Sequence, residues 1–132
     1  MPRKLLDNNF IHPSIQDVVS DNQLEIMNEV TQAVENDDIV VIGMAVNPHV
    51  GTARKVLKNA NLPFTYLQYG GYMSQWRKRN AIKMWSGWPT FPMVFVKGSL
   101  IGGASETQAL LNSGELQKML EEAETSPATK AG

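Results

Sequence analysis

The sequence predicts a three-layer α/β domain in which a four-stranded mixed sheet lies between helices. Segments with helical spacing alternate along the chain with short β-branched runs. The last two runs flank a Lys97-Gly98 turn, which is typical of a β-hairpin. A right-handed crossover makes the first two strands parallel, so the hairpin is antiparallel to the rest. At 132 residues the chain has the length of one domain and can bury about two thirds of its unfolded surface.

Residues 1–20 are expected to form an N-terminal extension ahead of a domain that spans residues 21–124. Ser20 or Asp21 can cap the first helix of this domain. The apolar positions of that helix recur at spacings of three and four, namely Leu24, Met27, Val30 and Val34. The β-branched run 39–44 is typical of a strand buried on both faces, so we expect it at the centre of the sheet.

A second helix and a second strand complete the first half of the domain. The loop 47–51 contains proline and glycine, and Thr52 is the expected cap of a helix that reaches about Ala60. Residues 64–69 are rich in aromatic and β-branched side chains and precede two glycines, a pattern typical of a strand that ends at a turn.

The second half predicts a helix over 72–85, the hairpin over 92–101 and a final helical stretch over 105–124. Ser113-Gly114 interrupts the last stretch, so we expect two consecutive helices there. Residues 125–132 are small and polar, and we expect them to form a flexible tail.

Composition excludes several classes of chemistry. The chain has no cysteine, so it has no thiolate nucleophile, disulfide or zinc ribbon, and no sulfur of its own to hold an iron–sulfur cluster. Its formal net charge of -1 argues against a protein that coats nucleic acid. No stretch reaches the roughly 18 apolar residues of a membrane span, so we expect no membrane insertion. Neither His12 nor the carboxylates form a ligand cluster, and we expect no metal and no cofactor.

Four local motifs point to one family. Trp88-Pro89-Thr90-Phe91-Pro92, Gly102-Gly103, Ser113-Gly114-Glu115-Leu116 and Pro48-His49-Val50-Gly51 occur in this spacing along residues 24–120. Together they resemble the glutaredoxin family of the thioredoxin fold, and above all its monothiol branch. In that family the last proline of the first motif follows a cis peptide bond beside the active site. The resemblance implies a thioredoxin-like, glutaredoxin-type fold.

The resemblance places Val50 where the family has its catalytic cysteine, so it implies no catalytic residue in this chain. Glutaredoxin catalysis needs a thiolate of lowered pKa at a helix N-terminus, and valine cannot be a nucleophile. The same substitution removes the protein ligand through which such families share a two-iron, two-sulfur cluster with glutathione. We therefore expect a protein that is not an enzyme.

The resemblance also implies a vestigial glutathione groove. Its candidate residues are Arg79, Phe91, Pro92, Gly103, Ala104 and Ser105. Two family contacts are expected to be lost, because the lysine that binds the glycine carboxylate falls on Ile42 and the aspartate that binds the γ-glutamyl amine falls on Ser105. Each missing charge-assisted hydrogen bond contributes about 1.5–3 kcal/mol, so we expect low affinity for glutathione.

Aromatic and basic side chains predict a partner surface, since Trp, Tyr and Arg are enriched in binding hot spots. Its candidate residues are Trp76, Arg77, Lys78, Tyr69 and Tyr72. The basic side chains of this segment, Arg79 and Lys83 included, can lie on one surface with those of Arg54, Lys55 and Lys58. Such a surface can contact RNA. A solvated amphipathic helix explains the same pattern. Two interpretations of His49 stay open. It is a base or ligand beside the position of the family's active site, or it is an ordinary loop residue.

These features favour a redox-inactive glutaredoxin-like protein that works as a structural or adaptor subunit of a larger assembly, with other protein subunits as its partners. The monothiol branch is often mitochondrial, so the resemblance implies a mitochondrial location for this protein, with the cytoplasm as the alternative. Two alternatives stay open. One is a module that still binds glutathione or a thiol peptide without oxidoreductase activity, and the other is RNA contact through residues 76–83.

Overall fold

The computed structural model describes residues 3–71 and 74–125, and its centre is a four-stranded sheet of order β2-β1-β3-β4. The strands are β1 (Ile39–Gly43), β2 (Thr65–Gln68), β3 (Met93–Val96) and β4 (Ser99–Gly102). β1 pairs parallel with β2 and antiparallel with β3, and β3 pairs antiparallel with β4. The predicted mixed sheet and its C-terminal hairpin are therefore confirmed.

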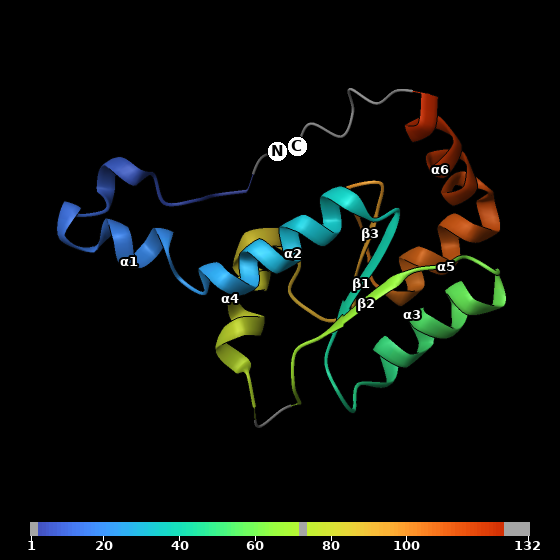
Figure 1. The fold of residues 1–132 in the computed structure, drawn as a ribbon, viewed down its shortest axis with the longest axis horizontal. Helices are drawn as coiled ribbons and strands as arrows, with labels where there is room; N and C mark the ends of the chain where they lie inside the picture. Colours follow the sequence, from blue (N-terminus) through green and yellow to red (C-terminus); the bar gives the residue numbers. More distant parts are fainter. Residues whose placement is uncertain (1–2, 72–73, 126–132) are drawn as a thin grey trace.

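Helices cover both faces of the sheet (Figure 1). The helices are α1 (Gln16–Ser20), α2 (Leu24–Asn36), α3 (Pro48–Asn59), α4 (Trp76–Ser86), α5 (Ala104–Ser113) and α6 (Glu115–Thr125), with short 3-10 turns η1 (Asn8–Phe10) and η2 (Pro13–Ile15) before them. α2 and α4 pack on one face, whereas α3, α5 and α6 pack on the other. Gly114, at φ 82, separates α5 from α6 as the sequence predicts, because this left-handed conformation suits glycine.

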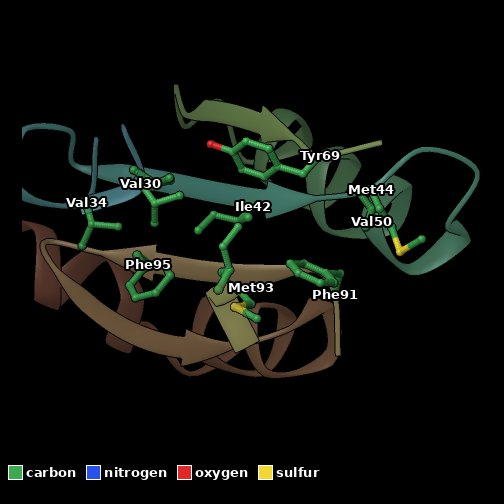
Figure 2. Packing of buried hydrophobic residues seen from close by; sticks show 11 residues of the cluster. Val30, Val34, Ile42, Met44, Val50, Tyr69, Phe91, Met93 and Phe95 are labelled. Carbon is green, nitrogen blue, oxygen red and sulfur yellow. The ribbon is translucent and has the colours of Figure 1, made fainter. Parts of the chain in front are cut away.

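Two apolar clusters hold these layers together, and β1 supplies both. Val40 and Ile42 face α2 and α4, and Figure 2 shows Ile42 among Val30 and Val34 of α2 and Phe95 of β3. The opposite cluster contains Ile39 and Val41 with the buried side chains Ala53, Leu57 and Leu116. All five residues of β1 are buried, which confirms a central strand covered on both sides.

Two helix starts differ from the predicted ones. α2 begins at Leu24 after Gln23, which has φ 53, so neither Ser20 nor Asp21 caps it and Ser20 ends the separate helix α1. α3 begins at Pro48, because the side chain of Asn47 accepts hydrogen bonds from the backbone amides of the following turn and proline suits the first helical position. The helix therefore starts four residues before the predicted cap, Thr52.

The last helices differ from the predicted ranges at their ends. α4 begins at Trp76, while Tyr72 lies outside the described residues. α6 ends at Thr125, so the first residue of the tail predicted over residues 125–132 belongs to the helix, and residues 126–132 lie outside the described part of the chain.

The N-terminal arm, residues 3–20, extends away from the sheet beyond α2 and α4 (Figure 1). None of the residues in η1, η2 or α1 is buried. Its contact with α4 includes hydrogen bonds from the Arg3 guanidinium to the carbonyls of Met84, at 3.5 Å, and Trp85, at 3.4 Å. Over the described residues, no helix has both the length and the apolar character that crossing a membrane requires.

Candidate functional site

A cavity of about 570 Å³ lies where the start of α3, the loop before β3 and the start of α5 meet. We call it the cis-proline pocket, because the Phe91-Pro92 peptide bond in its wall is cis, as the resemblance implies. Its lining residues are His49, Thr52, Val56, Trp88, Thr90, Phe91, Pro92, Gly103, Ala104, Ser105, Glu106 and Gln108. The structure thus brings together five of the six predicted groove residues and leaves Arg79 out.

Val50 is the third residue of α3, and its side chain points into the protein instead of the pocket. It is 3% exposed and belongs to the apolar cluster that faces α2 and α4, where Figure 2 shows it beside Met44. Val50 Cγ1 lies 2.6 Å from the place that a Cβ on Gly43 would take, so the strand passes close to the helix here. Val50 is absent from the described residues that line the pocket. The position that the resemblance assigns to the family's nucleophile is therefore a packing position.

Asn47 connects the start of α3 to the cis-proline loop. Its Oδ1 accepts hydrogen bonds from the amides of His49, at 2.9 Å, and Val50, at 3.4 Å. Its Nδ2 donates to the carbonyl of Phe91 at 3.4 Å. The carbonyl just before the cis-proline is thus bound by the protein's own side chain. The Asn-Pro pair in the sequence is a cap signal that could have identified this residue.

Glu106 closes the start of α5. Its Oε1 accepts a hydrogen bond from the Gly103 amide at 2.8 Å, and the Thr107 hydroxyl donates to the Gly103 carbonyl, also at 2.8 Å. Gly102, at φ 114, allows this contact, because a Cβ there would lie 2.7 Å from Glu106 Cγ. A glutamate three residues after a helix cap is the sequence signal of this bond, which is one half of a capping box because glycine has no side chain to supply the other half.

Arg79 is 7% exposed and faces the backbone near the end of β2. Its Nη1 donates to the carbonyl of Tyr69 at 3.0 Å and also to that of Ser74. A buried guanidinium needs such acceptors, because an unpaired charge is costly inside a protein. Arg79 therefore holds the segment between β2 and α4, and the structure does not place it at the pocket as a carboxylate-binding residue.

Ile42, which the resemblance places at the family's lysine, also lies away from the pocket. Ile42 is fully buried in β1, within the cluster that faces α2 and α4. A lysine at this place would have to bury its charge in an apolar core. Ile42 therefore offers no charge to a ligand in the pocket, and its correspondence with the family's lysine stays a prediction.

The candidate partner surface is only partly exposed. Trp76 is 54% exposed with the Arg77 guanidinium 5.3 Å from its ring centre, and Lys78 is half-buried. Tyr69 is buried, which corrects the expectation of an exposed ring; its hydroxyl donates to the Glu29 carboxylate. Burial first, and then the nearby Glu29 carboxylate, raise the pKa of Tyr69 above its usual range. Tyr72 lies outside the described residues.

The two groups of basic residues do not form the single surface that the sequence predicts. Arg54, Lys55 and Lys58 lie on α3, whereas residues 76–83 lie on α4 across the sheet (Figure 1). Arg54 instead lies over the ring of Tyr66 on β2, 4.0 Å from its centre. Contact of RNA with residues 76–83 alone stays a prediction.

Neither histidine belongs to a metal-binding cluster in the part of the chain that is described. His12 lies in the N-terminal arm, where its Nδ1 is 2.8 Å from the Ser14 hydroxyl, and His49 is exposed at the mouth of the pocket. Across residues 3–71 and 74–125, no three His, Asp or Glu side chains converge as metal ligands would.

Trp88 Nε1 is buried and has no hydrogen-bond partner among the described residues.

Comparison with known proteins agrees with this geometry. The glutaredoxin family model matches residues 48–101. The chain is 45% identical over 103 residues to a glutaredoxin-like protein of Dictyostelium discoideum, covering 78% of this chain and 84% of that relative. It is 29% identical to a mitochondrial monothiol glutaredoxin of Arabidopsis thaliana, covering 81% of this chain and 64% of that one.

A solved structure shows the same arrangement. Oxidized glutaredoxin 2 of Chlamydomonas reinhardtii superposes with a TM-score of 0.66 at 25% identity, covering 77% of this chain and 96% of that one. The four-stranded mixed sheet and its flanking helices are therefore those of a glutaredoxin-type thioredoxin fold.

Proposed function

The chain belongs to the glutaredoxin family, and we propose that it is a redox-inactive member that serves as a structural or adaptor subunit of a larger protein assembly. The observation that carries this proposal is the inward packing of Val50, which the resemblance places at the family's nucleophile, beside the cis-proline pocket. The chain has no cysteine at any other position to replace it. A fold can be kept for its shape after its chemistry is lost.

Internal hydrogen bonds around the pocket support the same proposal. The Phe91 carbonyl is bound by Asn47, and the Gly103 amide is bound by Glu106. Arg79 is bound to backbone carbonyls away from the pocket. Groups that would otherwise hold a free thiol peptide thus stabilise the protein itself.

The N-terminal arm supports a role in an assembly. Leu5, Leu6, Phe10 and Val18 are each at least 69% exposed, and Met84 of α4, whose carbonyl accepts from Arg3, is 65% exposed. Apolar surface of this kind on a single chain is typical of a protein–protein contact. We infer that partner subunits cover the N-terminal arm and the adjoining end of α4.

Two measurements test this function. Purified full chain should reduce a glutathione mixed disulfide no faster than buffer does, and any turnover would contradict redox inactivity. Tagged chain purified from its own cells should bring down a fixed set of subunits that also migrate with it on a native gel. Recovery of the chain alone, at the mass of a monomer, would contradict the adaptor role.

The location that we propose is the mitochondrion. Relatives named as mitochondrial monothiol glutaredoxins in Arabidopsis thaliana and Schizosaccharomyces pombe support it. Fractionation of cells that express the tagged chain should recover it with matrix or inner-membrane markers. Recovery with cytosolic markers alone would contradict this location.

A second candidate function is the binding of glutathione or a thiol peptide without oxidoreductase activity. The cis-proline pocket favours it, because about 570 Å³ is within the usual size of a small-ligand site, roughly 300–1,000 Å³. Calorimetric titration with glutathione measures this function directly. A dissociation constant below about 1 mM would support it, and the absence of heat would favour the purely architectural role.

A further inference from the structure

Strand β2 forms one edge of the sheet, and no other described strand pairs with its outer side. The sheet order is β2-β1-β3-β4, so β2 pairs with β1 alone. The amide of Tyr69, one residue after β2, donates to the Gly43 carbonyl of β1 at 3.0 Å. Peptide groups alternate between the two sides of a strand, so the amides and carbonyls of Tyr66 and Gln68 point away from β1. These groups form a short template for an added strand.

Helix α3 places basic side chains along this edge, on one face of the sheet. Tyr66 pairs with Val41, whose side chain faces α3, so the Tyr66 ring lies on the same face. The Arg54 guanidinium lies over this ring, 4.0 Å from its centre, and Arg54 Nε is buried with no hydrogen-bond partner among the described residues. Lys58 follows Arg54 by four residues, so it lies on the same flank of α3, and it is exposed.

No carboxylate neutralises these two cations within the described part of the chain, where the ion pair that forms joins Lys97 to Asp38. Residues 59–64, which connect α3 to β2, carry no charge. α5 packs against the other flank of α3, at the cis-proline pocket. The carboxyl end of α3 has a partial negative charge of about half a unit, which the cations of Arg54 and Lys58 outweigh. The α3 side of the β2 edge is therefore positive.

The opposite face of the same edge is acidic. The Thr65 hydroxyl donates to Asp37 Oδ2 at 2.9 Å, and Leu67 packs in the cluster that faces α2. A surface groove of about 470 Å³ runs along α2, and Glu25, Glu29 and Asp37 supply its charged walls. The two faces of the β2 edge therefore carry charges of opposite sign.

This difference argues against a second copy of the chain as the occupant of the edge. Two β2 strands that pair antiparallel are related by a two-fold axis perpendicular to the sheet, which keeps α3 of both copies on one face. Arg54 and Lys58 would then lie beside the same cations of the other copy. RNA also fits less well than a polypeptide, because it has no peptide groups to continue the ladder and its phosphates are repelled by the α2 face.

We propose that the β2 edge binds an extended segment of a partner polypeptide, which adds a strand to the sheet and carries acidic side chains at alternate positions. Successive side chains of a strand point to opposite faces, so acids at every second position all lie on the α3 face, near Arg54 and Lys58. The side chains between them are uncharged or basic and face α2. Backbone hydrogen bonds supply affinity in such strand addition, and the side chains supply specificity. This inference rests on the proposed adaptor function and names the chemistry of one partner.

NMR titration of the full chain labelled with ¹⁵N tests the proposal with three capped peptides. The first is acetyl-Thr-Glu-Thr-Glu-Thr-Glu-Thr-amide, the second has lysine in place of each glutamate, and the third is the acidic peptide with every internal amide N-methylated. The acidic peptide should bind roughly tenfold more tightly than the lysine peptide, and it should shift the amides of Tyr66 and Gln68 and slow their hydrogen exchange. The N-methylated peptide keeps the charge but cannot form the ladder, so it should leave both amides unchanged.

Four results would overturn the proposal. They are equal or tighter binding of the lysine peptide, equal binding of the N-methylated peptide, no response to the acidic peptide up to ~5 mM, and tighter binding of a uridine octamer. Sedimentation of the isolated chain tests the remaining occupant. A dimer in which the amides of Tyr66 and Gln68 are protected would show that a second copy takes the edge, and would also overturn the proposal.

Two variants of equal charge change identify the source of the preference. Lys58→Gln removes an exposed cation on the β2 flank of α3 and should weaken the acidic peptide about threefold to fivefold. Lys4→Gln removes an exposed cation from the N-terminal arm, which extends away from the sheet, and should leave the affinity unchanged. Equal weakening by both variants would assign the preference to net charge and overturn the role of the α3 flank.

The outcomes separate this inference from the function on which it rests. A chain that migrates in a large native complex but does not bind the acidic peptide would contradict the role of the β2 edge and leave the adaptor role standing. A chain that is monomeric in cell extracts but shows the expected peptide preference would contradict the adaptor role alone.

Discussion

The cis-proline pocket and the N-terminal arm differ in how far the chain itself contacts their side chains. Around the pocket, the polar groups of Asn47 and Glu106 are bonded to nearby backbone, and Val50 is packed in the core. In the N-terminal arm, large apolar side chains stay in solvent, with Phe10 at 79% exposure. The body of this protein buries its own apolar core, and the exposed apolar side chains of the arm support the proposal that a partner covers it.

We expect the largest difference between the two regions in how much a substitution lowers the free energy of unfolding. Ile42→Ala should lower the free energy of unfolding by about 2–5 kcal/mol, because it opens a cavity at a fully buried position. Phe10→Ala in the arm should change it by less than ~0.5 kcal/mol. Urea unfolding of the isolated chain measures both. Equal effects would show that the arm is part of the cooperative core.

Thiol reactivity tests the inward direction of residue 50. Val50→Cys and Thr52→Cys each create the chain's single thiol, the first at a buried position and the second at an exposed position on the pocket. The thiol at 50 should react about a hundredfold more slowly with a soluble disulfide reagent, because it must wait for local opening. Equal rates would mean that residue 50 faces the pocket.

Some features of the fold could be predicted from the sequence alone. The β-branched run 39–44 and the Gly114 break were predictable, since burial on two faces and a left-handed helix end leave local patterns. The cap of α3 was misplaced at Thr52, because Pro48 can open a helix as well as stop one and Asn47 competes as its cap.

The site was less predictable because its contacts join distant segments. Arg79 meets backbone carbonyls of Tyr69 and Ser74, and no spacing rule distinguishes those acceptors from a ligand's carboxylate. Tyr69 adjoins two glycines and looks exposed in sequence, yet its hydroxyl reaches Glu29 on α2, forty residues away. Contacts at such separations depend on how the layers pack.

Removing the carboxylate that closes α5 should have a moderate effect. Glu106→Ala breaks the bond to the Gly103 amide and should cost about 0.5–2 kcal/mol, the usual effect of losing a helix cap. Glu121→Ala, at an exposed position on α6, is the matched control and should change stability by less than ~0.5 kcal/mol. Urea unfolding of the two variants gives the comparison, and equal values would contradict a capping role for Glu106.

The smallest effect is expected from Tyr69, and only in alkali. Its pKa is raised above the usual 10.0 in the folded protein, so the unfolded chain loses this proton first as pH rises. The stabilisation is fully present below pH 10 and decreases as pH rises above that value. Tyr69→Phe should therefore weaken the fall of the unfolding free energy between pH 9 and pH 11. An unchanged slope would contradict a buried, neutral tyrosine.

The native mass of the chain in extracts of its own cells tests the central claim most directly. We expect the 14.6 kDa chain to migrate in a complex several times heavier than itself. Leu6→Asp with Phe10→Asp in the arm should return the chain to monomer mass without changing its unfolding free energy. Migration of the unaltered chain as a monomer would contradict the claim that this cysteine-free glutaredoxin is kept as a subunit.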